Sequence, residues 1–267
     1  ESFIPMYMTG QIEPYYFKTP QNGVFLHFMR SAGTVALTGE AVAGHHSEGR
    51  YDLTKAKGEV AYCRRRAEAM LENASPLMDI YREDGAARLN AFLLADSRTP
   101  GRRRHILHTP PLCTMEPDYL AALLEKQGLP EENRQRIRAY ARTRREQLET
   151  ILLTDTVHLE LPRLTERAFA QFPPALPLSG LFYGQDVPYT YETYLAHLAQ
   201  TEAFAAAHPR CELEFTGGGA FRNLQITIHE GQWAMVSKGK SPAIHFVIRH
   251  PKLRAAIERF VPPVVEE

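Results

Sequence analysis

Hydrophobic and polar positions along the chain repeat one pattern twice: an extended apolar stretch, a polar or proline break, and then an amphipathic helix. The first copy begins with the stretch at 88–94 and ends with a helix at 117–124. The second begins at 211–215 and ends with a helix at 251–260. Strands and helices that alternate in this way are typical of α/β proteins. The repeat predicts two related lobes, each a small sheet covered by helices.

A long charged helix is expected between the two copies. It follows Pro130, a residue type that favours the start of a helix, and it has acidic residues in its first turn. We expect a first lobe at 1–130, a connecting helix and linker at 131–172, and a second lobe at 173–267, which opens with a proline-rich segment. The long helix would then join the two lobes.

Shorter patterns predict individual elements on either side of this helix. Residues 23–29 have the composition of a buried strand, 34–37 would be its hairpin partner, and 87–95 is also strand-like. Apolar residues at helical spacing predict helices over 53–81 and 189–208. Further predicted elements are a helix at 116–127 closed by Gly128, and strands at 223–229 and 232–237.

Composition narrows the classes of function. The 31 basic and 31 acidic residues balance, so no overall field attracts the chain to nucleic acid or to an anionic membrane. The three cysteines are far apart and lack the spacing of a zinc site or a disulfide framework, which favours the reducing cytoplasm. No apolar run approaches the roughly 18 to 20 residues of a membrane span, and no secretory signal is recognisable.

No catalytic or metal-binding motif stands out. Three glycines at 217–219 follow a strand but lack the spacing and the following helix of a phosphate-binding loop, so a hairpin turn is favoured. His105 and His108, with Cys113 nearby, would face opposite sides of a strand, which disfavours a shared metal ion. Ser179 lies outside any nucleophile-elbow motif. We therefore expect no catalytic residue, no metal site and no cofactor.

The second copy of the pattern carries the candidate ligand site. Basic and polar side chains at its strand ends could converge on an anionic small molecule, since short loops there often carry binding groups. Nearby tyrosines resemble the lining of an aromatic pocket. The alternatives are ordinary lysines on a solvated hairpin and tyrosines that belong to the core. The expected ligand-binding residues are Arg222, Asn223, Lys238, His245, Tyr183 and Tyr189.

Residues 226–229, 233–238 and 245–251, with the helix that follows, resemble the sensor region of helix-turn-helix regulators found in clostridial-type bacteria. The resemblance covers about the final third of the chain. It implies a homodimeric effector domain that binds a small-molecule or protein ligand and acts without catalysis. It also implies that DNA is contacted only through an N-terminal domain missing from this chain, which begins at Glu1.

The same region resembles, in strand and helix order, one half of the phospholipase D-like fold, which is built from two similar halves. The catalytic histidine-lysine-aspartate motif of that family is absent, because His229 is followed two places later by Gly231 and not by lysine. A phosphohydrolase with a histidine nucleophile could not work with these residues. The alternative function is therefore a phosphodiesterase-like or other hydrolase with an unrecognised active site.

Overall fold

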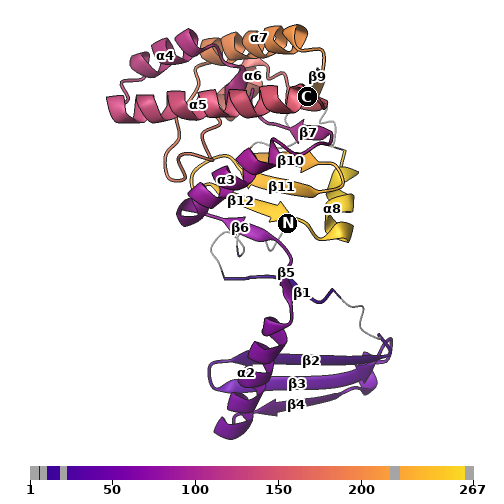
Figure 1. Ribbon diagram of the computed structural model, residues 1–267. Helices are drawn as coiled ribbons and strands as arrows, with labels where there is room; N and C mark the ends of the chain where they lie inside the picture. The colour runs from indigo at the N-terminus through magenta and orange to yellow at the C-terminus, as the bar shows by residue number, and fades with distance from the viewer. Residues whose placement is uncertain (1–5, 7–10, 19–22, 217–222, 262–267) are drawn as a thin grey trace. The chain divides into compact units, whose positions relative to one another are not determined.

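The structure is a computed structural model that describes residues 6, 11–18, 23–216 and 223–261. The chain is a mixed α/β protein and divides into two compact units, Glu1–Leu77 and Met78–Glu267 (Figure 1). The two lobe boundaries expected from the sequence, at residues 130 and 172, both fall inside the second unit. None of the helices within the described residues is long and apolar enough to cross a membrane.

The first unit contains an antiparallel sheet with one helix packed against a face. Ala36 of the sheet is buried against Val60 and Cys63 of the helix. The hairpin predicted after residue 23 is confirmed, but the burial expected for its first strand is not found, because no residue of β2 is buried and Phe25 is 67% exposed. The elements of this unit are β1 (Tyr15–Tyr16), β2 (Phe25–Ala32), β3 (Val35–Val42), η1 (His46–Glu48), β4 (Arg50–Thr54), α2 (Lys57–Glu72) and β5 (Ser75–Pro76).

Helix α2 is shorter at both ends than the sequence predicted. The first residues of the predicted 53–81 helix belong to β4, where Leu53 pairs with Leu37 of β3. After the helix the chain becomes extended, and β5 pairs with β1. Proline has no N–H for a helical hydrogen bond, so Pro76 is incompatible with a helix that continues through it.

The second unit is built on one sheet of seven strands, counted over the described residues (Figure 1). At one side of the sheet, four strands pair with their neighbours in antiparallel fashion. At the other side, three strands run parallel. Helices connect the parallel strands, as parallel pairing requires. In spatial order the strands are β6 (Asp79–Tyr81), β12 (Ile244–Ile248), β11 (Trp233–Lys238), β10 (Leu224–His229), β7 (Arg103–Ile106), β8 (Val157–Pro162) and β9 (Cys211–Thr216).

Helices pack on both faces of this sheet. The helices predicted at 116–127, at 189–208 and from residue 131 are confirmed, and so is the helix end at Gly128, whose φ of 68° is a conformation that glycine adopts without strain. The helices are α3 (Ala86–Asp96), α4 (Pro117–Lys126), α5 (Glu131–Leu152), α6 (Glu166–Gln171), α7 (Tyr191–Ala207) and α8 (Pro251–Glu258), with 3-10 helices η2 (Glu83–Gly85) and η3 (Leu112–Thr114).

The segment 87–95, predicted to be a strand, is helix α3. Leu89 and Leu93, four residues apart, lie on one face of this helix and pack beside Trp233 and Met235 of β11. A short apolar run fits a buried strand and a buried helix equally well by periodicity alone. The alanine and leucine content of the segment favours the helix.

The expected pair of lobes joined by a charged helix is not found. Strand β7 precedes α5 in the chain and β10 follows it, yet the two strands pair in one sheet, with Thr227 opposite His105. Helix α5 is present and charged, but it packs against this sheet and against α4. A local pattern of strands and helices carries no information about which distant strands pair, so the sequence repeat was wrongly extended to two separate sheets.

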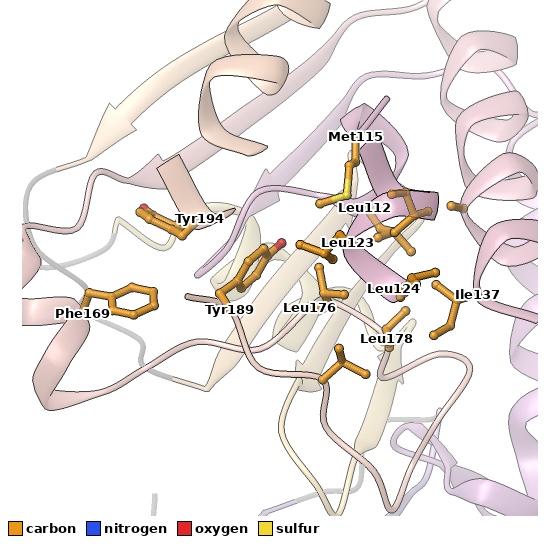
Figure 2. Packing of buried hydrophobic residues seen from close by; sticks show 13 residues of the cluster. Leu112, Met115, Leu123, Leu124, Ile137, Phe169, Leu176, Leu178, Tyr189 and Tyr194 are labelled. Carbon is orange, nitrogen blue, oxygen red and sulfur yellow. The ribbon is translucent and has the colours of Figure 1, made fainter. Parts of the chain in front are cut away.

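Two apolar clusters hold α5 in place. In the first, which lies among the helices, Leu124 of α4 and Ile137 of α5 are fully buried (Figure 2). In the second, Leu148 of α5 packs with Leu159 of β8 and Leu198 of α7. Helix α5 is therefore fixed against both neighbouring helices and the sheet, which sets the positions of the side chains it directs toward the strands.

Candidate functional site

A cavity of about 180 Å³ lies in the second unit, between one face of the sheet and helices α3 and α5. Strands β7, β8, β10, β11 and β12 form its floor. Leu89 of α3 contributes to one wall, and Tyr140, Arg144 and Gln147 of α5 line the side opposite the strands. The lining combines apolar side chains with polar and charged ones, and the polar groups left free to bind a ligand decide which molecules the cavity can hold.

The polar part of the floor follows from the alternation of side chains along a strand. On β10, Gln225 and Thr227 line the cavity, whereas Ile226 and Ile228 pack in the apolar cluster beneath α8 on the other face. The strand register places Thr227 opposite His105 of β7, which also lines the cavity. Gln225, Thr227 and His105 therefore lie on neighbouring strands of the floor, which also carries Arg103 and His245.

His105 is the titratable member of this group. Burial, with a contribution from the charge of Arg103, lowers the pKa of His105 to about 4. The ring is neutral at pH 7 and therefore has one donor nitrogen and one acceptor nitrogen. Neither nitrogen is hydrogen-bonded to any residue in the described part of the chain. Because His105 lines the cavity, its ring can form a hydrogen bond with a molecule bound there.

A positively charged side chain reaches the same cavity from α5. Nη1 of Arg144 donates to Oε1 of Gln147 at 2.8 Å, and Nη2 donates to Oδ1 of Asn90 at 2.8 Å. The guanidinium carbon lies 4.8 Å from the centroid of the Tyr140 ring, a cation–π contact. Both hydrogen-bond acceptors are neutral amides, and among the described residues Arg144 forms no ion pair.

A buried charged network closes the cavity beside α3. Oδ1 of Asp96 accepts hydrogen bonds from Nε1 of Trp233 and Nδ1 of His229, both at 2.7 Å, and Oδ2 accepts one from Nη2 of Arg103 at 3.0 Å. Burial alone would raise the pKa of Asp96, but these hydrogen bonds and the charge of Arg103 hold it below its usual value. Protein donors thus occupy this carboxylate, and the network stabilises the fold.

His245, one of the predicted ligand residues, lines the cavity on β12. Its Nε2 lies 2.9 Å from the carbonyl oxygen of Ser179 and must donate to it, so its Nδ1 accepts from the hydroxyl of Ser237 at 2.8 Å. Burial lowers the pKa of His245 to about 4, which keeps the ring neutral. Tyr183, also predicted, packs edge-on against this ring at a centroid distance of 5.5 Å but lies outside the cavity lining.

Among the residues predicted at the strand ends, Lys238 is not brought together with His245. Lys238 lies on the opposite face of β11 from Ser237, and its Nζ donates to the carbonyl oxygen of Pro242 at 3.1 Å. The carbonyl oxygen of Asn223 accepts a hydrogen bond from the backbone of Gly239 at 2.8 Å. Arg222 lies outside the described residues. Lys238 was grouped with His245 because the two are close in sequence, which ignores the two faces of a strand.

Tyr189 belongs to the apolar core among the helices, where it lies with Tyr194 and Leu176 (Figure 2). Its hydroxyl is 2.7 Å from Nδ1 of His197, and burial raises the pKa of Tyr189 well above its usual value. Tyr189 therefore lies in the core, which was the alternative considered for the tyrosines. Of the six predicted ligand residues, His245 lines the cavity, and Tyr183 packs against the ring of His245.

Two candidate nucleophiles are held in unreactive states. Burial raises the pKa of Cys113, which lines the cavity, to about 12, so its reactive thiolate is scarce at neutral pH. Both ring nitrogens of His229 face acceptors, Asp96 on one side and the carbonyl oxygen of Pro100 at 3.0 Å on the other. Across the described residues, no group of three His, Cys, Asp or Glu side chains could hold a metal ion.

Sequence reasoning did not assign ligand contacts to Arg144, His105, Gln225 or Thr227. The signal on β10 was present, because Gln225 and Thr227 alternate with isoleucines. Such alternation normally indicates a strand with one face in water. Here that face turns toward a cavity under α5.

No protein-family model matches this chain, and no curated protein matches it either. The resemblances to helix-turn-helix regulators and to the phospholipase D-like fold therefore stay predictions. The function has to be argued from the cavity and from the groups that line it.

Proposed function

We propose that this chain is the ligand-sensing effector domain of a bacterial transcriptional regulator, with the ligand bound in the cavity between the sheet and helices α3 and α5. The observation that carries the proposal is a cavity of about 180 Å³ whose floor includes His105, Gln225 and Thr227, side chains that form no hydrogen bond with one another or with other side chains among the described residues. Contact with DNA in such a regulator belongs to a separate domain. A homodimeric state is part of the same proposal and is checked by light scattering.

The volume of the cavity sets the size of the ligand. An engineered apolar cavity of about 150 Å³ in another protein holds benzene. A molecule of one small ring, or of a few branched carbons, therefore fits the space beside Leu89, Leu107 and Leu159. Empty apolar space of this size destabilises a protein, and a ligand that fills it stabilises the folded state.

Binding is favoured over catalysis by the state of the lining groups. The thiol of Cys113 stays protonated, and the ring of His105 is too weakly basic to remove a proton efficiently near neutral pH. The phosphodiesterase-like alternative requires an activated nucleophile. His229, the histidine at which the motif of that family was sought and found incomplete, is enclosed by Asp96 and Pro100.

Helix α5 gives a ligand a route to a conformational effect. Its residues Tyr140 and Arg144 line the cavity, while Ile137 and Ala141 of the same helix pack in the core shared with α4. A ligand that contacts both α5 and the strands favours the helix position that suits it best. Coupling to DNA binding would follow from that shift only if the two helix positions differ in ligand affinity.

The test is a thermal-shift screen against small metabolites, read from the fluorescence of Trp233, the only tryptophan in the sequence. We expect some compounds to raise the melting temperature, because a ligand that binds only the native state stabilises it. Thr227→Leu should fill the floor and abolish these shifts, whereas Thr150→Leu on the exposed side of α5 should keep them.

Three results bear on this proposal. Shifts that persist unchanged in Thr227→Leu, or the absence of any shift in the wild-type protein, would refute the cavity as a ligand site. Turnover of bis(p-nitrophenyl) phosphate by the wild-type protein would favour the hydrolase alternative.

A further inference from the structure

We propose that the ligand of this cavity is a small organic monocarboxylate whose charge is received by Arg144, an inference that rests on the proposed function. The cavity lining contains two arginines and one acidic residue. Arg103 is paired with Asp96, at a nitrogen–oxygen distance of 3.0 Å. Arg144 is left as the uncompensated cation of the lining.

Arg144 differs from neighbouring arginines on the same helix. Arg134 and Arg138 form ion pairs with Glu131, and Arg145 pairs with Glu116 at 3.0 Å. The two acceptors of Arg144 are the amide oxygens of Asn90 and Gln147, which satisfy hydrogen bonds without neutralising charge. Its charge is also felt nearby, since it lowers the pKa of His245 in addition to the larger effect of burial.

The guanidinium retains donors for a ligand. It carries five N–H groups, and the hydrogen bonds to Asn90 and Gln147 use two of them. A carboxylate binds a guanidinium through two parallel hydrogen bonds, which an amide or an alcohol cannot match in strength. Removing a charge from water is costly unless it is paired. A carboxylate bound at Arg144 would supply the negatively charged partner that this side chain lacks among the described residues.

The approach to Arg144 is also suited to an anion. A second hollow of about 420 Å³ lies between α3 and α5, and it shares Tyr140, Arg144 and Gln147 with the cavity. These three side chains therefore separate the hollow from the cavity. The lining of the hollow includes Arg136 as well as Arg144 and no acidic residue. A cleft lined by charges of one sign raises the local concentration of ions of the opposite sign.

The rest of the ligand is defined by the walls. The apolar part of the lining includes leucines of α3 and β8, Leu107 directly after β7, and Met235 of β11. Thr227 and the neutral ring of His105 offer hydrogen bonds at the floor. The lining thus fits a compact apolar body with one anionic group, and benzoate is a suitable probe because its ring is close in size to the cavity.

The experiment compares benzoate with benzamide, its neutral counterpart, and with benzylamine, its cationic counterpart, by calorimetry and thermal shift at one ionic strength. We expect benzoate to bind at least about tenfold more tightly than benzamide, and benzylamine not to bind, since charge-assisted hydrogen bonds are about twice as strong as neutral ones. Arg144→Gln should weaken benzoate binding by about tenfold or more and leave benzamide binding unchanged. Arg144→Lys keeps the charge but loses the planar guanidinium, so its affinity for benzoate should lie between those of the wild type and Arg144→Gln.

The matched control is Arg142→Gln, which removes an exposed arginine from the same helix and should leave benzoate binding unchanged. Circular dichroism and Trp233 fluorescence check that each variant is folded. Equal affinity for benzoate and benzamide, or full benzoate binding by Arg144→Gln, overturns the carboxylate assignment and leaves the cavity as a site for neutral ligands. If benzoate fails to bind, the hits of the metabolite screen decide. Carboxylates lost in Arg144→Gln support the assignment, neutral or cationic hits overturn it, and a screen without hits overturns the proposed function as well.

Discussion

Replacing Asp96 with asparagine should destabilise the second unit strongly. The carboxylate accepts three hydrogen bonds, from Trp233, His229 and Arg103, and the side chains of Asp96 and Arg103 are only 10% and 1% exposed. An asparagine of the same shape has one acceptor oxygen, and its amide group would face donors. The charge of Arg103 would also lose its partner in a buried position.

The magnitude follows from the burial of the pair. Removing one partner of a buried ion pair costs roughly 3–5 kcal/mol, because the remaining charge stays uncompensated. The matched control is Asp79→Asn, which breaks the ion pair with Arg249 in the same unit, where the two side chains are 40% and 50% exposed. Exposed pairs contribute about 0–1 kcal/mol. The same chemical change should therefore differ severalfold in cost between the two sites.

Urea unfolding followed by the fluorescence of Trp233 measures both variants. Trp233 is the only tryptophan of the sequence and lies in the second unit, so the signal reports on that unit. The slope of each transition should match the wild type, which shows that the variants unfold from similarly compact states. If Asp96→Asn costs within about 1 kcal/mol of Asp79→Asn, the reasoning about the buried network is refuted.

Three further predictions concern the same unit. The folded pKa of His245, about 4, lies below the unfolded value near 6.5, so its stabilising contribution is present above pH 6.5 and up to roughly 3 kcal/mol is lost as the pH falls toward 4. Urea titrations across this range should show a shallower loss for His245→Gln, and an unchanged slope would contradict the assignment. Leu124→Ala, at a fully buried position, should cost about 2–5 kcal/mol in the same assay, and a cost below about 1 kcal/mol would contradict its place in the core. Gly128→Ala should cost about 1 kcal/mol because φ is 68°, and a gain in stability would contradict that conformation.

Local periodicity predicted individual helices and strands, because the spacing of apolar residues within one element is a local property of the sequence. Helices α4, α5 and α7 have apolar stripes long enough to exclude a strand, and the strands β10 and β11 are short runs bounded by turns. Helix α3 was assigned wrongly because its apolar run is short and continues onto the exposed side of the helix, at Ala91 and Leu94, so the sequence shows no clear helical stripe. Strand pairing was beyond the sequence, since β7 and β10 are neighbours in the sheet but lie on either side of α5 in the chain.

The candidate site was hidden for the same reason. Gln225 and Thr227 have the pattern of a strand face in water, and only the pairing of β10 with β7 beneath α5 makes that face the floor of a cavity. Arg144 is one of many arginines on a helix that also carries glutamates. No acid lies three or four residues from Arg144, but the same is true of Arg138, which pairs with Glu131. Packing decides which arginine loses contact with those acids. Arg144, the residue proposed to bind the ligand, is distinguished by the lack of an acidic partner among the described residues, and that property becomes visible only once the neighbouring segments are placed.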